Sequence, residues 1–316
     1  MTNVGVCVKC KDELNVIEFM EHYYSLGFCY IFFVDDKSNP SVQSIIGERF
    51  KGKYKIVINE KWLQPVSLIS TFTKHINDNF SEISSRVDYL LNVDMDEYLV
   101  LKNPIFKNKI QNVISYYEPF DLLKINWVMF GNNNLKYGDC TTLKDKFTMS
   151  SEYCNPTVKS IFNLNTYKNE RTIITSHIVK FNDNKVIKNV ENNTTTNHYG
   201  EILKNMSTKN VNLYVAHFII QTTERFITRR YCIFDKCKIN DSLKPLLPNF
   251  SIKEIQEIIK NNKTNLIDYL HNNNVKLNEE LKKIEIGIKK HIKPFFNLIN
   301  RNRIDNYDLV ENKIIK

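Results

Sequence analysis

The sequence contains no long apolar run, no cysteine framework and no internal repeat. A transmembrane helix needs about 20 consecutive apolar residues, so we expect no transmembrane span. A strand-like segment, Val4–Val8, starts almost at the first residue, and we therefore expect no signal peptide. The seven cysteines are an odd number at irregular spacing, which argues against a disulfide scaffold and favours a reducing, cytoplasmic setting. Peripheral association with a membrane stays open.

A CxxC spacing, Cys7–Cys10, lies inside an apolar stretch and is followed by no second CxxC. A structural zinc site needs four ligands, which this pair alone does not provide. We therefore expect buried, ordinary thiols here rather than a metal or redox pair.

Positive charge is in excess but is not gathered in one segment. The 44 Lys and Arg residues against 35 Asp and Glu give a net charge of +9, spread along the 316 residues. Nucleic-acid-binding proteins concentrate such charge in a patch or stripe, so we expect no nucleic-acid partner. A small anionic partner, such as a nucleotide diphosphate, is compatible with this charge.

Strand-like and helical segments alternate along the first part of the chain. This order predicts an α/β fold in which helices flank a mostly parallel, Rossmann-like mixed sheet. The predicted strands are Val4–Val8, Tyr30–Val34, Tyr54–Ile58, Val87–Val93, Leu122–Met129, His177–Phe181 and Leu213–Ile220, and the predicted helices are Glu13–Leu26 and Pro65–Asn79.

The apolar pattern becomes helical after about residue 250, through Ile255, Ile258 and Leu266 and again over Leu277–Leu298. We predict a main domain of residues 1–250 and a helical C-terminal extension of residues 251–316. Amphipathic helices need an apolar partner. The extension therefore either joins protomers in a homo-oligomer or packs on the sheet of its own chain.

Two acidic clusters, Asp35–Asp36 and Asp94–Glu97, directly follow predicted buried strands. In sheets of this class, ligands bind beyond the carboxyl ends of the strands. Two carboxylates that flank one residue repel each other unless a positive charge lies between them, and a divalent cation supplies that charge. Mn²⁺ or Mg²⁺ can then bridge the carboxylates to a diphosphate and stabilise it as a leaving group. A turn cluster without a metal is the structural alternative.

The order of several segments carries a family resemblance. It resembles glycosyltransferases of the GT-A fold, in particular glycosyltransferase family 92 and the related family-2-like branch. The resemblance extends from about residue 4 to about residue 231 and implies a GT-A-like sheet. The matching segments are Lys11–Glu13, Glu18–Gly27, Val34–Ser38, Leu90–Leu99, Trp127–Asn132, Val158–Phe162 and His217–Phe226.

The chain departs from the family pattern at three points. Lys11-Asp12 replaces Arg-Asn, Phe19 replaces a helix Trp, and Phe218 replaces Tyr. These changes are mild in chemistry and leave the fold prediction intact. They put in doubt which donor and which acceptor are used.

The resemblance implies different tasks for the residues of the acidic motif. Asp96 is expected to ligate the metal directly. Asp94 is expected to contact the ribose or sugar of the donor, or the metal through water. Glu97 either takes part in function or caps the following turn.

A histidine is expected to complete the metal site. His217 follows an apolar strand, and the resemblance favours it, while His177 and His198 are competitors. Imidazole suits Mn²⁺ better than Mg²⁺. A core histidine with satisfied hydrogen bonds is the structural alternative.

Four further residues are predicted to bind the donor. Asp36 can accept hydrogen bonds from the uracil or ribose, and Asp35 is a weaker candidate for the same task or a turn residue. Lys11 and Glu13 line the loop after the first strand, where Lys11 can meet the diphosphate. Solvated surface is the alternative for both.

The acceptor side is predicted from a loop after residue 131 and from two aromatic residues. An inverting transfer needs a carboxylate base for the acceptor hydroxyl, and Asp139 and Glu152 are the candidates. Trp127 and Phe130 are candidates for an apolar platform under a sugar, with core packing as the alternative.

These features predict a metal-dependent glycosyltransferase that moves a hexose from a UDP-sugar to a glycan or glycoprotein acceptor, with inversion as the expected outcome. The first alternative is a nucleotidyltransferase of the same fold. That class is expected to have a loop rich in Gly and Arg after the first strand, which Cys10–Glu13 lacks. The second alternative is a non-catalytic sugar-binding or scaffolding protein.

Overall fold

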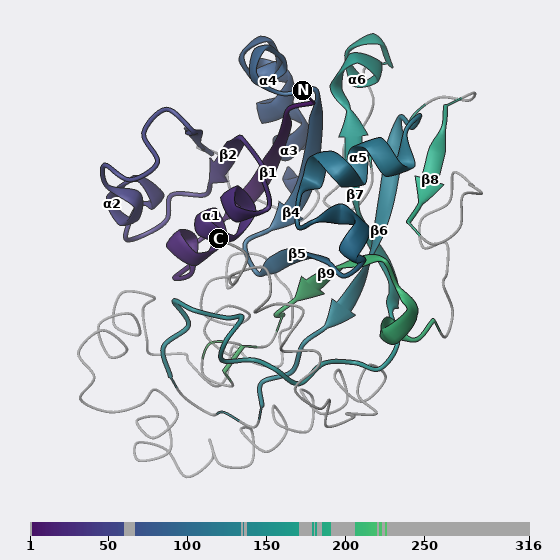
Figure 1. Ribbon diagram of the computed structural model, residues 1–316. Coiled ribbons are helices and arrows are strands. Elements are labelled where there is room, and N and C mark those ends of the chain that lie inside the picture. Colours follow the sequence, from purple (N-terminus) through teal and green to yellow (C-terminus); the bar gives the residue numbers. More distant parts are fainter. Residues whose placement is uncertain are drawn as a thin grey trace.

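The computed structural model describes residues 2–59, 67–133, 135, 138–170, 179, 181, 185–190, 206–219, 221–222 and 225. Within these residues a nine-stranded mixed sheet forms the centre of the molecule, with helices on both faces (Figure 1). The α/β prediction of a Rossmann-like sheet is thereby confirmed. The predicted helical extension, residues 251–316, and most of the predicted strand at residues 177–181 lie outside the described residues.

Four parallel strands form one half of the sheet, in the order β3-β2-β1-β4. The central strands read as nearly continuous apolar runs because helices cover both of their faces. The elements of this half are β1 (Val4–Cys10), α1 (Val16–Ser25), β2 (Tyr30–Asp35), α2 (Val42–Ile46), β3 (Tyr54–Ile58), α3 (Ser67–Asp78), α4 (Phe80–Arg86) and β4 (Tyr89–Asp94).

The other half continues from β4 in the order β7-β6-β9-β5, with β8 beside β6. Its ladders are mixed, because β7 runs antiparallel to both β4 and β6, whereas β9 runs parallel to β6 and antiparallel to β5. The elements are β5 (Glu97–Leu101), η1 (Pro104–Phe106), α5 (Ile110–Tyr117), β6 (Leu122–Met129), β7 (Asn155–Asn163), α6 (Leu164–Glu170), β8 (Ile187–Asn189), η2 (Thr208–Asn210) and β9 (Leu213–His217).

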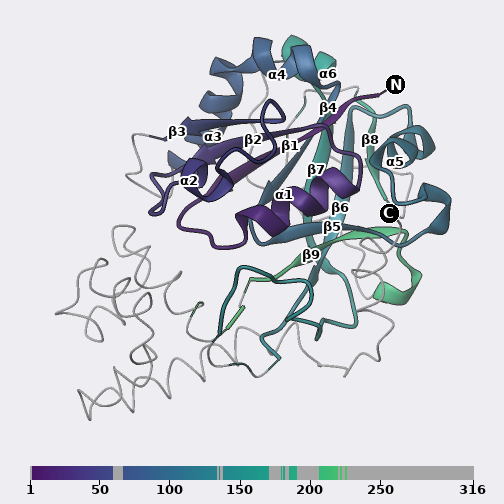
Figure 2. The same ribbon diagram turned by 60° about the vertical axis from the view of Figure 1, so that its left-hand side comes forward.

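The connection between β4 and β5 forces the sheet to curl. The strands β7, β6 and β9 lie between them in the sheet order, a path of about 19 Å in a flat sheet. The linking residues, Met95 and Asp96, span about 10 Å at most. The sheet therefore bends so that the β5–β9 ladder lies near the end of β4 (Figures 1 and 2). The acidic motif occupies this crossing.

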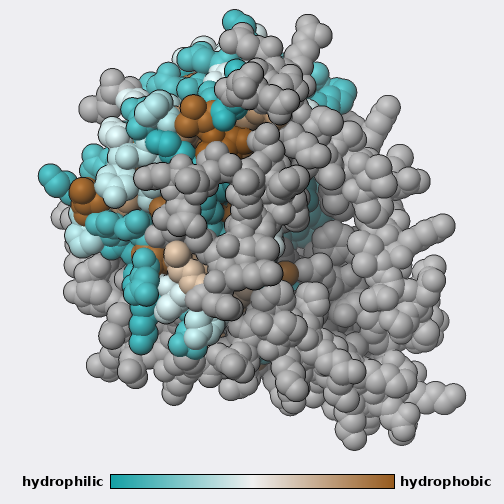
Figure 3. Space-filling model, turned by 90° about the vertical axis from the view of Figure 1, so that its right-hand side faces the viewer, coloured by the Kyte–Doolittle hydropathy of each residue, from teal (hydrophilic) through white to brown (hydrophobic). Residues whose placement is uncertain are grey.

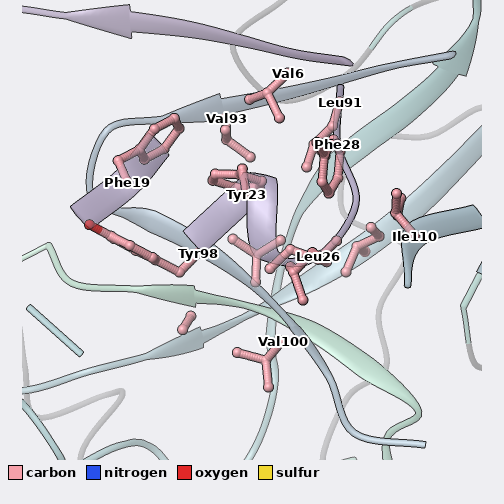
Figure 4. Close-up of a cluster of buried hydrophobic side chains, with 14 of the residues drawn as sticks. Val6, Phe19, Tyr23, Leu26, Phe28, Leu91, Val93, Tyr98, Val100 and Ile110 are labelled. Carbon is pink, nitrogen blue, oxygen red and sulfur yellow. The ribbon is translucent and has the colours of Figure 1, made fainter. Parts of the chain in front are cut away.

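Hydrophobic clusters fill both sides of the sheet. One lies under α1 and α5, and Figure 4 shows Phe19 and Tyr23 of α1 against Val6, Leu91 and Val93 of the strands. The other lies under α3, α4 and α6. Each large side chain buried in this way contributes about 1.5–3 kcal/mol to stability.

The two cysteines of the CxxC spacing belong to different clusters. Cys10 lies in the cluster under α1, and Cys7 lies in the cluster under α3. Residues three apart on a strand point to opposite faces. Both are buried free thiols, which confirms the prediction for this pair.

In the described part of the chain, the exposed large apolar side chains are Leu14, Ile58, Ile105, Tyr116, Tyr153 and Val186. None of the helices there is long and apolar enough to cross a membrane. On the face shown in Figure 3, the coloured residues are mainly hydrophilic, and the hydrophobic ones gather chiefly in one patch near the top.

The predicted elements differ from the observed ones mainly at their ends. The strands β3 and β6 have the predicted bounds, but α1 starts at Val16 rather than Glu13. The last predicted strand ends at His217 rather than Ile220. The Phe218 N–H donates to the Asp96 carbonyl at 2.8 Å in the last bond of the β5–β9 ladder, because β5 begins at Glu97.

Candidate functional site

The site lies where the strand order changes direction. The strand β1 has β2 on one side and β4 on the other, and all three run in parallel. The register pairs Lys9 with Asp94 and Cys10 with Asp35, so both acidic clusters reach the same edge of the sheet, as predicted. In open α/β sheets this is the position of the ligand crevice.

A lysine from the neighbouring strand contacts the acidic motif. The Lys159 ammonium lies 2.7 Å from Asp94 Oδ2 and 3.0 Å from Glu97 Oε2. The Lys159 and Glu97 side chains are 0% exposed, whereas the Asp94 side chain keeps 28% exposure. Glu97 Oε2 also accepts a hydrogen bond from the Asp94 N–H at 2.8 Å, so Glu97 closes the turn on itself.

The charges of this group shift its pKa values strongly. Burial alone would raise the pKa of Asp94, but the Lys159 ammonium outweighs it and holds that pKa well below its usual range. Burial alone would lower the pKa of Lys159, but Asp94 and Glu97 outweigh it and raise it to about 12. Burial raises the pKa of Glu97 to about 7. Lys159 thus supplies positive charge next to the carboxylates, a role that the sequence alone had suggested for a metal ion.

Lys159 was not predicted as a site residue. The signals in the sequence were a single charge inside the apolar segment Val158–Phe162 and the place of that segment in the family resemblance. A charged residue in such a segment is almost always paired when it is buried.

Asp96 and His217 lie together on another side of the motif. The distance from Asp96 Oδ2 to His217 Nε2 is 3.6 Å, and both side chains are buried. The Trp127 ring lies against the imidazole, with ring centroids 4.2 Å apart. The His217 Nδ1 atom is buried and has no hydrogen-bond partner in the described part of the chain.

This pair fits a divalent cation. With metal–ligand bonds of about 2.1 Å, two ligands of one octahedral ion lie about 3 to 4.2 Å apart, and the observed 3.6 Å falls in that range. A carboxylate oxygen and an imidazole nitrogen are also donor types that Mn²⁺ accepts. Among the described residues no group of three or more His, Cys, Asp or Glu side chains is placed to hold an ion. Small divalent cations commonly take one or two protein carboxylates and complete their shell with substrate phosphates and water.

Buried polar contacts hold the turn between β4 and β5 in place. The Asn15 amide donates to the Met95 carbonyl at 2.6 Å and to the Tyr98 hydroxyl at 2.7 Å. The Tyr98 hydroxyl donates to Glu18 Oε2 at 3.0 Å, and the same oxygen accepts from the Leu143 N–H at 2.7 Å. The start of α1 therefore ties the motif to the loop that contains residue 143.

The two aspartates after β2 differ in their contacts. Asp35 Oδ1 accepts hydrogen bonds from the Ser38 N–H at 2.9 Å and the Ser38 hydroxyl at 2.5 Å, as in an Asx-type turn. Asp36 Oδ1 accepts from the Asn59 amide at 2.5 Å. The Oδ2 atoms of both aspartates are buried and have no hydrogen-bond partner among the described residues. Burial raises the pKa of Asp36 to about 6, against the opposing Asn59 hydrogen bond.

The loops after β1 and β2 brace each other. The Lys11 ammonium donates to the Lys37 carbonyl at 2.8 Å, and its side chain keeps 31% exposure. The Arg225 guanidinium donates to the Asp12 carbonyl at 2.6 Å and lies 3.1 Å from Glu13 Oε2. Glu13 is therefore part of an ion pair that connects this edge to the end of the described chain, a pairing that the sequence analysis missed.

The predicted acceptor residues lie in different surroundings. Asp139 is exposed, and its carboxylate accepts hydrogen bonds from the Thr141 N–H and hydroxyl, which outweigh desolvation and lower its pKa. The Glu152 carbonyl accepts from the Thr208 N–H at 2.9 Å, and the residue is partly buried. Phe130 is 1% exposed and packs against Phe218. Trp127 is partly exposed and contacts His217, so it is the aromatic candidate with free surface at the site.

The contacts in the structure do not test several of the predicted roles. The roles of Lys11, Glu13, Asp35 and Asp36 toward a donor, and those of Asp139 and Glu152 as a base, stay predictions. The competing histidines, His177 and His198, lie outside the described residues.

No protein-family model and no curated protein matches the sequence. Several solved structures match part of the chain. HddC from Yersinia pseudotuberculosis complexed with GMP-PN is 11% identical with a TM-score of 0.32, over 56% of this chain and 82% of its own. A second structure of HddC gives 12% identity and a TM-score of 0.30, over 58% and 84%. The 4-diphosphocytidyl-2C-methyl-D-erythritol synthase from Anaerococcus prevotii gives 9% identity and a TM-score of 0.31, over 55% and 78%. Likeness at these TM-scores carries no argument about the reaction.

Proposed function

We propose that this chain is a metal-dependent glycosyltransferase of the GT-A type that transfers a hexose from a UDP-sugar to a glycan or glycoprotein acceptor. The observation that carries the proposal is the position of the acidic motif. Asp94 and Asp96 follow the buried parallel strand β4 at the point where the strand order changes direction, and Asp96 lies 3.6 Å from His217. Lys11, Asp35 and Asp94, which belong to three of the segments that resemble glycosyltransferase family 92 and its family-2-like relatives, follow or end the strands β1, β2 and β4 at this edge.

The residues of the site divide the work of such a reaction. Asp96 and His217 are the residues that would hold Mn²⁺, or less favourably Mg²⁺. A bound ion supplies Lewis-acid stabilisation to the departing diphosphate. Asp36 presents a buried carboxylate oxygen that can accept a hydrogen bond from a nucleoside, and Lys11 is close enough to this edge to attract phosphate.

A base must take the proton of the acceptor hydroxyl if the transfer inverts the anomeric centre. The Asp139 carboxylate is already engaged with Thr141, and its lowered pKa makes it a weak base. Glu152 is therefore the stronger of the two candidates. Trp127 is proposed to provide the apolar surface under a sugar.

The test is hydrolysis or transfer of a UDP-sugar panel with and without Mn²⁺. Asp96→Ala should lower turnover by about 100-fold or more while the thermal unfolding midpoint stays close to that of the parent. Asp78→Ala is the matched control, because Asp78 is half-exposed on α3 and pairs with Lys74. Unchanged turnover in Asp96→Ala would remove the mechanism. No turnover and no thermal shift with any sugar nucleotide would remove the function.

A nucleotidyltransferase uses paired aspartates and a metal as well, and the same protein can be assayed for it. Incubation with a nucleoside triphosphate and a sugar 1-phosphate would then release diphosphate. The loop after β1, Lys11–Asn15, contains neither Gly nor Arg, and we therefore expect no diphosphate release. A sugar-binding protein without catalysis would show a thermal shift but no turnover in either assay.

A further inference from the structure

The buried cation Lys159 is fixed at one side of the acidic motif. The strand β7 is the antiparallel neighbour of β4, and the Asn92–Ser160 pair places residue 159 beside the end of β4. Its ammonium contacts Asp94 Oδ2 at 2.7 Å and Glu97 Oε2 at 3.0 Å, with no exposure to solvent. A lysine held this way is a permanent charge of the site, unlike a side chain on a mobile loop.

Two other carboxylate oxygens of the motif face His217. Asp96 Oδ2 lies 3.6 Å from His217 Nε2, and Glu97 Oε1 lies 3.9 Å from the same nitrogen. Glu97 thus directs one oxygen to Lys159 and the other to His217. A divalent cation bound between Asp94 and Glu97 would lie next to the Lys159 ammonium, and like charges repel strongly where water is excluded. At the position between Asp96 and His217, the Glu97 carboxylate faces the ion with one oxygen and Lys159 with the other, which reduces this repulsion.

We propose that Lys159 is a built-in counter-cation of the motif, a positioning residue that keeps Asp94 out of the ligand set of the metal. The Asp94 carboxylate, which keeps 28% exposure, is then free to accept hydrogen bonds from hydroxyl groups of the donor. This inference rests on the metal site of the proposed function and adds a residue that directs the ion to one side of it.

The test is a titration with Mn²⁺ alone, followed through the electron paramagnetic resonance signal of the free ion. Lys159→Met removes the counter-cation and frees the carboxylates of Asp94 and Glu97 for the ion. We expect it to bind Mn²⁺ about tenfold more tightly than the parent. Lys159→Met combined with Asp94→Asn should return toward the parent affinity. Equal or weaker binding by a folded Lys159→Met protein would overturn the proposal, because a merely structural lysine gives no gain in affinity.

If Lys159→Met fails to fold, as shown by the lack of a cooperative unfolding transition, a second variant tests whether Asp94 is a ligand of the metal. Asp94→Asn alone should bind Mn²⁺ within about threefold of the parent, whereas loss of a true ligand lowers metal affinity by about tenfold or more. Lys159→Arg, which keeps the charge, should also stay within about threefold. A tenfold loss in Asp94→Asn would show that Asp94 is a ligand and that the proposal is wrong.

The metal titration and the turnover assay distinguish failure of the Lys159 proposal from failure of the proposed function. A protein that shows the expected Mn²⁺ affinities but uses no sugar nucleotide disproves the proposed function and supports the role of Lys159. Conversely, turnover of a UDP-sugar together with a large loss of Mn²⁺ affinity in Asp94→Asn supports the function and overturns that role.

Discussion

Asp36 is the acidic residue whose buried surroundings give a direct link between charge and stability. It is 3% exposed, and it keeps one hydrogen bond, from Asn59. Burial raises its pKa from 3.8 to about 6. An ionised carboxylate with an oxygen that has no partner in the described part of the chain is costly to the folded state. A polar ligand that reaches this oxygen would recover that cost.

Asp36→Asn should flatten the dependence of stability on pH. Because the pKa is higher in the folded state, the folded protein binds the proton more tightly. The stabilising contribution is therefore fully present below pH 3.8 and is lost as the pH rises through about 6. Asparagine stays neutral, so the variant should gain about 1–3 kcal/mol in the free energy of unfolding at neutral pH.

Urea unfolding of both proteins between about pH 4 and pH 7 measures this effect. Asp78→Asn is the control, since Asp78 is exposed and should leave the pH profile of the parent in place. Parallel profiles for the parent and Asp36→Asn would contradict the expectation.

At the scale of elements, α1 connects the acidic motif to the loop before β7. Glu18 is 7% exposed and accepts hydrogen bonds from the Tyr98 hydroxyl and from the N–H groups of Leu143 and Lys144. One turn later, His22 Nε2 lies 2.8 Å from the Leu99 carbonyl, and Nδ1 lies 3.3 Å from the Lys144 ammonium. The buried face of this helix is therefore partly polar, and it joins segments far apart in the sequence.

Glu18→Ala should destabilise the protein by about 2–4 kcal/mol, because it leaves buried donors without their acceptor. Glu18→Gln keeps one acceptor oxygen and should cost less. The matched control is Glu21→Ala on the exposed face of the same helix, where the expected change is within about 0.5 kcal/mol. Equal midpoints of urea unfolding for Glu18→Ala and Glu21→Ala would show that the contacts of Glu18 contribute nothing net.

The sequence predicted those elements whose own residues carry the pattern. The strands β1, β2 and β4 are nearly continuous apolar runs because both of their faces are covered, and β6 keeps six apolar residues around Lys124 and Asn126. The strand β7 was missed as an element, since Asn155, Lys159 and Ser160 interrupt its apolar pattern. Those residues can be buried because neighbouring strands supply hydrogen-bond and ion-pair partners for them. The residue pattern of β7 alone does not indicate these partners.

The same reasoning explains which parts of the site were predicted. The acidic residues after β2 and β4 were found because strand ends converge in a parallel sheet. The partners Lys159 and Arg225 were not, because they arrive from positions 65 and 212 residues away from their carboxylates. The sequence provides the acids, and only the folded arrangement shows what neutralises them.

At the scale of the whole molecule, both hydrophobic clusters are built on one sheet and its helices in the described part of the chain. Their members in the described residues run from Val4 to Phe218. They lie on both faces of one continuous sheet, so we expect the sheet and its helices to unfold as one cooperative unit. The domain boundary predicted at residue 250 stays a prediction. It can be tested with a fragment that ends there.

The fragment of residues 1–250 should fold by itself. We expect a single cooperative unfolding transition, with a free energy of unfolding of about 5–15 kcal/mol. Circular dichroism at far- and near-ultraviolet wavelengths during urea unfolding checks this, with the full chain as the reference. Retained far-ultraviolet signal with loss of the near-ultraviolet signal would instead indicate a core that needs residues 251–316.

Glu97 and His217 occupy one rung of the β5–β9 ladder, directly opposite each other. An insertion or deletion of one residue in either strand would turn the Glu97 or His217 side chain of that strand to the opposite face of the sheet. Evolutionary changes of chain length are therefore tolerable in the loops between Leu101 and Leu213 but not within the strands themselves. Homologous chains of very different length can thus share this rung, and alignments anchored on it should place their gaps outside the two strands.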